Sequence, residues 1–237
     1  MSATADRPDP AFAVRRLIRA AKKTALATLT AGDAGPFVSL ATVAPDMDGS
    51  PLLLLSRLAE HSTNLAKDAR AALLFDGTGG HANPQEGPRA SVCGRLLAVA
   101  DDALRRRYLK RHPGAALYAG FADFSLFRLE MTGAHWVGGF ARARRIGASV
   151  ALPTDVANGF RQAQGALTDL LNGEAPQIAI DLARRRRRMG EWRFSAIDPD
   201  GFDIAKGESW LRVDFPTPVA DPDAVLPTVL RLTHGGD

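Results

Sequence analysis

The spacing of apolar residues changes along the first third of the chain. Between residues 11 and 23, Phe12, Leu17, Ile18 and Ala21 recur at helical intervals with basic residues between them, which predicts an amphipathic helix. Four β-prone runs follow within about fifty residues, separated by turn-forming clusters such as AGDAGP and PDMDGS. These runs cover residues 24–30, 37–44, 51–56 and 71–75. Short strands at this spacing predict a meander or barrel.

The strand pattern resumes after a Gly- and Asn-rich loop. Residues 90–100 are predicted to form a strand, with the single cysteine, Cys93, as a small core residue. A basic helix follows, and residues 125–131 and 134–140 are predicted to form two strands joined by a turn.

The last third of the chain has a different character. Residues 153–171 and 176–189 are helical in pattern, a hairpin-like segment covers residues 192–215, and a final helix begins near Asp221. Because each strand of the segment has one apolar face that helices can cover, a compact α+β module is predicted. Residues 142–152 mix basic residues with Gly, Ala and Ser, which favours a domain boundary there.

The composition and charge of the chain limit the classes of protein to which it can belong. Hydrophobic residues make up 46% of the chain, but no apolar stretch is long enough for a membrane span. The first ten residues lack the pattern of a secretory signal, and one cysteine excludes an intramolecular disulfide, so a cytoplasmic location is expected. A net charge of +4 is too mild to indicate a nucleic-acid partner. Part of that charge is a run of five arginines, residues 184–188, interpreted as a solvated helix end or an anion site.

The familiar catalytic motifs are absent from the sequence, and no catalytic residue is assigned. One segment, LLLLSRLAEHSTNL, gathers polar groups where a strand ends and a helix is predicted to begin at a Ser62 cap. A helix N-terminus beside an arginine and hydroxyls can hold a phosphate, although a capped helix with a polar surface is the simpler interpretation. The polar members are Ser56, Arg57, His61, Ser62 and Asn64.

The order of these segments resembles the pyridoxamine-phosphate-oxidase-like FMN-binding split barrel, and especially its haem-utilisation branch. The matching stretches are TALATLT, the run from GPFVSLATVA to RAALLF, GPRASVCGRLLAV, and DFSLFRLEMTGAHWVGGFARAR. The resemblance implies an α+β fold in which an antiparallel split β-barrel domain, residues 11–147, precedes a small α+β domain, residues 153–237.

The resemblance also implies a cofactor, FMN or haem, and a homodimer with cofactor sites at its interface. By that resemblance, Ser56, Arg57, His61, Ser62 and Asn64 lie on the phosphate side of a flavin. Thr28 and Ser39 lie nearer the ring system, and Gly139 and Arg142 line the pocket, where the arginine can pair with a propionate or phosphate. His234, the one histidine in the C-terminal third, is the candidate iron ligand.

Three functions remain open from the sequence. The first is an oxidoreductase that uses FMN or opens haem oxidatively. The second is a protein that stores or buffers haem or flavin without turnover, which is favoured by the absence of basic residues in the strand FVSLATVA. The third, RNA binding through the arginine run, lacks an aromatic platform for bases, and neither a nucleic-acid nor a membrane partner is expected.

Overall fold

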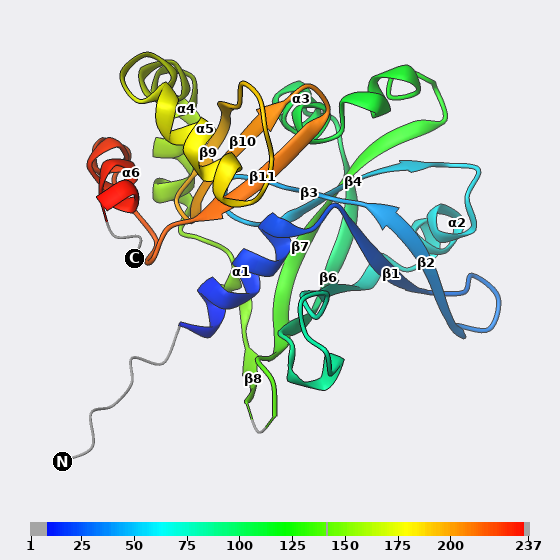
Figure 1. Cartoon of the computed structure of the whole chain (residues 1–237). Helices are drawn as coiled ribbons and strands as arrows, with labels where there is room; N and C mark the ends of the chain where they lie inside the picture. The colour runs from blue at the N-terminus through cyan, green and yellow to red at the C-terminus, as the bar shows by residue number, and fades with distance from the viewer. Residues whose placement is uncertain (1–8, 141, 235–237) are drawn as a thin grey trace. The chain divides into compact units, whose positions relative to one another are not determined.

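The computed structural model describes residues 9–140 and 142–234, without the side chains of Thr233 and His234. Two compact units are present (Figure 1). The first runs to Leu109 and resumes over Ala115–Ala151, and the second comprises Lys110–Gly114 and the chain from Leu152 onward. The domain limits of 11–147 and 153–237 stay a prediction.

The first unit contains an eight-stranded antiparallel sheet with the strand order β2-β1-β5-β6-β7-β4-β3, and β8 pairs with β7. Its strands are β1 (Lys23–Leu29), β2 (Pro36–Thr42), β3 (Ala44–Pro45), β4 (Pro51–Ser56), β5 (Arg70–Asp76), β6 (Arg89–Val99), β7 (Phe124–Val137) and β8 (Ala143–Ile146). Its helices are α1 (Pro10–Ala20), α2 (Glu60–Lys67) and α3 (Asp102–Arg111), whose last two residues belong to the second unit. Short 3-10 turns lie at Pro84–Glu86, Ala148–Val150 and Pro113–Leu117, and the first two residues of the last of these belong to the second unit.

Helix α1 begins where the sequence places it. The Asp9 carboxylate accepts hydrogen bonds from the amides of Ala11 and Phe12, and Pro10 occupies the first helical turn, where its missing N–H costs nothing. Val14 and Ile18 of this helix are fully buried against the sheet.

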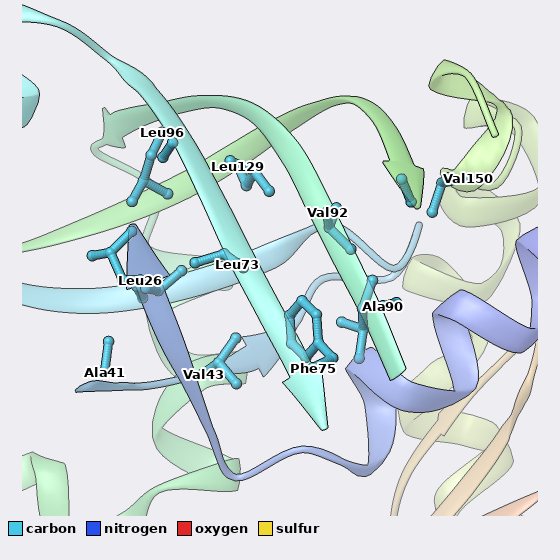
Figure 2. Packing of buried hydrophobic residues seen from close by; sticks show 14 of the residues in the cluster. Leu26, Ala41, Val43, Leu73, Phe75, Ala90, Val92, Leu96, Leu129 and Val150 are labelled. Carbon is cyan, nitrogen blue, oxygen red and sulfur yellow. The ribbon is translucent and has the colours of Figure 1, made fainter. Parts of the chain in front are cut away.

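The main core fills the inner face of the sheet (Figure 2). Alternate residues of each strand point inward, as a half-buried strand requires. Leu26, Leu73, Phe75, Val92 and Leu129 are fully buried there. The predicted antiparallel α+β fold is therefore confirmed.

Strand β7 differs from its prediction, because it is continuous through Thr132 and Gly133. Its register with β6 shifts between Cys93 and Gly94, which leaves Thr132 as the extra residue of a β-bulge. A side chain at position 133 would place its Cβ 2.7 Å from the carbonyl oxygen of Ile146, so glycine is required for β8 to approach. Cys93 lies in β6 as expected but is exposed.

The second unit contains a three-stranded antiparallel sheet in the order β11-β10-β9 instead of the two-stranded hairpin that was expected. Its elements are α4 (Thr154–Glu174), α5 (Pro176–Arg185), β9 (Arg193–Asp198), β10 (Gly201–Lys206), β11 (Ser209–Asp214), a 3-10 turn (Pro222–Ala224) and α6 (Val225–His234). Within the described residues, no helix has the length and apolar character needed to cross a membrane.

Buried ion pairs hold the three strands of the second unit together. Arg212 of β11 donates two hydrogen bonds of 2.6 and 2.8 Å to the carboxylate of Asp198 in β9. Asp203 of β10 pairs with Arg111, whose guanidinium lies 3.4 Å from the ring centroid of Trp210. Such paired burial is the condition under which charges are tolerated in a core.

Candidate functional site

The predicted phosphate-side segment begins at the end of β4, where Ser56 and Arg57 contact the loop before β7. The Ser56 hydroxyl donates to Asp123 Oδ2 (2.8 Å) and accepts from the amide of Leu58 (3.2 Å). The exposed Arg57 guanidinium donates to the Ala122 carbonyl (2.6 Å). Asp123 was not predicted, and nothing in its sequence setting marks it. Its carboxylate disfavours an anion at Ser56, so Arg57 is the better anion contact.

Asn64 and Thr28 tie α2 to β1. The Asn64 amide donates to Thr28 Oγ1 (3.1 Å), and its Oδ1 accepts from the amide of Ala31 (2.9 Å). Asn64 is fully buried and Thr28 is 3% exposed. Both side chains have protein partners, so their observed role is to anchor the helix.

Ser62 does not cap α2, contrary to the sequence interpretation. The helix begins earlier, at Glu60, and its N-cap residue is Ala59, which makes no side-chain capping bond. Ser62 is the third helical residue, and its own amide donates to the Ala59 carbonyl (3.0 Å). The hydroxyl is therefore left for another partner.

The first turn of α2 carries two polar atoms that have no hydrogen-bond partner in the described part of the chain. His61 Nδ1 is hydrogen-bonded to Ser39 Oγ of β2 at 3.1 Å. Neither His61 Nε2 nor Ser62 Oγ has a hydrogen-bond partner among the described residues, although both atoms are buried. Burial lowers the pKa of the His61 imidazole, which favours the neutral ring. A neutral imidazole nitrogen and a hydroxyl without protein partners can both bind a ligand.

Gly139 and Arg142 lie beyond the far end of β7. Gly139 has a φ of +114°, and a Cβ there would lie 2.8 Å from the carbonyl oxygen of Glu86, so a close backbone approach already explains the glycine. The Arg142 carbonyl accepts from the Gly138 amide (2.8 Å), and the Arg142 side chain is exposed.

The predicted site residues therefore form two groups. Phe124, at the start of β7, pairs with Ser56, whereas Val137, at its end, pairs with Arg89. Thirteen residue steps along a strand span about 40 Å. Within one chain the structure brings Ser39, His61 and Ser62 together but does not bring Arg142 to them.

The iron-ligand prediction falls on His234, the last residue of α6. Its side chain lies outside the described part of the structure, and it belongs to the second unit. Among the described residues, no group of three or more His, Cys, Asp or Glu side chains is placed to hold a metal ion.

One surface escaped the sequence interpretation altogether. On the outer side of β2, β1, β5 and β6, apolar side chains alternate with the core residues and remain uncovered; we call this surface the bare face. Val38, Leu40 and Leu74 are 64%, 69% and 45% exposed. The strand register aligns them in two rows. The bare face comprises Ala25, Ala27, Val38, Leu40, Ala72, Leu74 and Cys93.

Together, the antiparallel sheet with its inner core and the separate three-stranded sheet define a split-barrel protein with a C-terminal α+β unit. The family model described as CREG, beta-barrel, matches residues 5–152. The chain therefore belongs to the CREG beta-barrel family, which confirms the predicted split-barrel relationship.

One curated protein matches part of the chain. The chain is 34% identical over 113 residues to the chloroplastic non-canonical haem oxygenase HOZ of Arabidopsis thaliana, a match that covers 46% of this chain and 33% of that protein. The chain thus spans about a third of the length of this curated relative.

Two solved structures share the fold over almost the whole chain. One is a protein of unknown function from Agrobacterium tumefaciens, with a TM-score of 0.75, 23% identity and coverage of 98% of each chain. The other is a haem-binding protein from Mycobacterium smegmatis, with a TM-score of 0.58, 24% identity and coverage of 96% of this chain and 97% of the other.

Proposed function

We propose that this protein binds haem and opens it oxidatively, with O2 as oxidant and an external electron donor as reductant. The observation that carries the proposal is the 34% identity over 113 residues with a non-canonical haem oxygenase. The shared fold with a haem-binding protein is compatible with it. Haem would supply the oxygen chemistry, while the protein would bind it and orient it.

The first turn of α2 fits such a ligand. Ser39 Oγ is hydrogen-bonded to Nδ1 of His61, which leaves Nε2 as the ring nitrogen that has no partner among the residues described by the structure. A histidine that ligates iron commonly has its other ring nitrogen hydrogen-bonded in this way. His61 is therefore a second candidate ligand beside His234. Because Nε2 is buried, ligation through His61 requires α2 to shift.

Arginines at both ends of β7 can pair with carboxylates. The exposed guanidinium groups of Arg57 and Arg142 suit propionates, and a charge-assisted hydrogen bond contributes about 1.5–3 kcal/mol. Thr28 and Asn64 would act indirectly, because they fix α2 on the sheet.

We further propose a homodimer in which each cofactor site takes residues from both copies. Two observations support it: Arg57 and Arg142 lie near opposite ends of β7, too far apart for one ligand on one chain, and the bare face is apolar and uncovered. A second copy seated on the bare face would bury that surface.

A second candidate function is binding of FMN. The specific observation in its favour is the Ser62 hydroxyl, which is buried, has no partner among the described residues and lies in the first turn of a helix, where phosphates bind. The Asp123 carboxylate beside Ser56 argues against a phosphate at that position.

The test is a pair of absorption titrations of the purified chain, one with haem and one with FMN. We expect a saturable Soret band with haem and no saturable flavin binding; flavin binding without haem binding would overturn the haem proposal. The spectra of His61→Ala and His234→Ala identify the ligand, and His81→Ala, an exposed loop histidine, is the control.

Turnover separates the enzyme from a carrier. With ascorbate in air, an oxygenase should lose its Soret band and release a changed pigment. A carrier would keep the band and return intact haem on extraction, which would contradict the oxidative step while leaving haem binding in place.

A further inference from the structure

The five arginines from Arg184 to Arg188, here called the arginine tip, form the end of α5 and the turn after it. All five residues are exposed. The helix ends at Arg185, so only the first part of the tip lies within the last turn, where cations complement the helix dipole. The dipole therefore does not account for the arginines at positions 187 and 188.

The turn after α5 is a Schellman motif with an arginine at its left-handed position. The Arg188 amide donates to the Ala183 carbonyl at 2.9 Å. The Arg187 amide donates to the Arg184 carbonyl at 2.8 Å. Arg187 has a φ of +58°, a conformation that glycine usually provides at this position. Keeping an arginine there costs stability, which points to a use for its side chain.

Most of the positive charge of the tip is not paired with acidic side chains in the described part of the protein. Arg184 pairs with Asp181, but both side chains are largely exposed, at 59% and 43%. Arg186 donates to the carbonyl of Arg212. The side chains of Arg185, Arg187 and Arg188 have no hydrogen-bond or ion-pair partner within the part of the chain that the structure describes.

The tip also accounts for the net positive charge of the chain. Removing its five positive charges from the formal net charge of +4 leaves −1 for the rest of the chain. The rest of the chain is therefore close to neutral on balance, and the net positive charge that attracts anions comes from the tip.

The residue types in the tip limit the class of partner that it can bind. Every cation in the run is arginine, and the next residue, Met189, is 70% exposed. Arginine and methionine are enriched at protein interfaces, whereas lysine is depleted, and the guanidinium fork matches carboxylates in pairs. All the aromatic residues between α5 and the end of β11 are buried, so nucleic-acid bases have nothing to stack on. One exposed methionine is too little apolar surface for insertion into a lipid interface.

We propose that the arginine tip is a docking surface for an acidic segment of a partner protein. The Arg185, Arg187 and Arg188 guanidinium groups bind its carboxylates, and Met189 contacts its apolar atoms. This inference does not depend on haem binding.

The experiment measures the fluorescence anisotropy of a labelled peptide of mixed Glu and Asp, titrated with the full chain. We expect saturable binding that weakens as salt rises. The triple variant R185Q/R187G/R188Q should weaken binding about tenfold, from three contacts of about 0.5 kcal/mol each. Arg145→Gln, which removes an exposed arginine of β8, is the control and should change little.

A single variant tests the strain argument. Arg187→Gly should raise Tm by about 2 °C, because it relieves the left-handed arginine, yet weaken peptide binding. Equal loss of binding in the triple variant and Arg145→Gln would overturn the proposal. So would tighter binding of a single-stranded oligoribonucleotide or of phosphatidylglycerol vesicles than of the peptide, or a Tm that Arg187→Gly leaves unchanged or lowers.

Discussion

The two outer regions of the large sheet are both apolar, but the described part of the chain covers only one of them. On β4 and β7, Leu52, Leu54 and Leu126 are buried beneath a layer that includes Leu104 and Tyr108 of α3. On β2 and β5, Val38, Leu40 and Leu74 face outward and are exposed. A strand with apolar residues on both faces therefore needs a second layer to cover it. For β4 and β7 it is α3; for the bare face we propose a second copy of the chain.

The largest loss of stability is expected from a cavity on the covered side of the sheet, beneath α3. Leu126→Ala should destabilise the protein by about 2–5 kcal/mol, because it removes buried methyl groups and leaves a cavity under α3. Leu40→Ala, the same change on the bare face, should alter the stability of the dilute monomer by less than about 0.5 kcal/mol. Urea unfolding at low and high protein concentration measures both. Equal losses at every concentration would mean that the two regions do not differ in the folded monomer.

A second effect on the covered side depends on pH. Burial raises the pKa of Tyr108 to about 12, against an ordinary value of 10.0, while its hydroxyl bonds to Thr42 Oγ1 at 2.6 Å. The pKa of Tyr108 is higher in the folded protein than in the unfolded chain. The stabilisation that the neutral phenol contributes is therefore fully present below pH 10 and is lost as the pH rises towards 12. The loss should reach about 2–3 kcal/mol.

The control for the pH effect is Tyr108→Phe, which removes the ionisable group from the covered side. Its unfolding midpoint in urea should fall less steeply with pH than that of the wild type, and the difference between the two curves isolates Tyr108 from other groups that titrate in this range. Parallel curves would show that Tyr108 ionises as readily in the folded protein as in the unfolded one.

Local patterns predicted the fold because they follow local physics. The β-prone runs became β1, β2, β4, β5 and β6, and the helical spacing that starts at residue 11 became α1, which ends at Ala20. The same patterns failed where pairing with a strand distant in sequence determines the local structure. Thr132 and Gly133 read as a turn, but pairing with β6 absorbs them as a bulge. The hairpin-like pattern over residues 192–215 also missed the middle strand, β10, whose buried Asp203 pairs with Arg111, a residue remote in sequence.

The candidate site was less predictable than the fold. The sequence grouped Ser56 to Asn64 by proximity along the chain, yet their side chains go to different partners: Asp123 for Ser56, and Thr28 for Asn64. Only the contact of His61 with Ser39 shows which ring nitrogen is left for a ligand. The outward direction of Cys93 depends on the register that places Ala72 opposite it, with Val92 in the core. A single sequence shows none of these pairings.

The smallest effect on folding is expected from a charge introduced on the bare face. The same change tests most directly whether a second copy covers that surface. Leu40→Asp should leave the monomer folded, because the side chain is 69% exposed, but should prevent a second copy from covering that surface. Leu117→Asp, at an 81% exposed leucine outside the bare face, is the matched control. Sedimentation velocity should show a dimer for the wild type and the control, and a monomer for Leu40→Asp.

Cys93 provides an independent test of whether a second copy covers the bare face. It is the single cysteine of the chain, and it lies on the bare face, aligned across the strands with Val38. A second copy seated there would shield its thiol. Reaction with a coloured disulfide reagent should therefore be slow in the wild type and in Leu117→Asp, and fast in Leu40→Asp. A monomeric wild type whose thiol reacts as fast as that of the variant would mean that the bare face is uncovered in solution, and the proposed shared site would then need another way to bring Arg142 to Arg57.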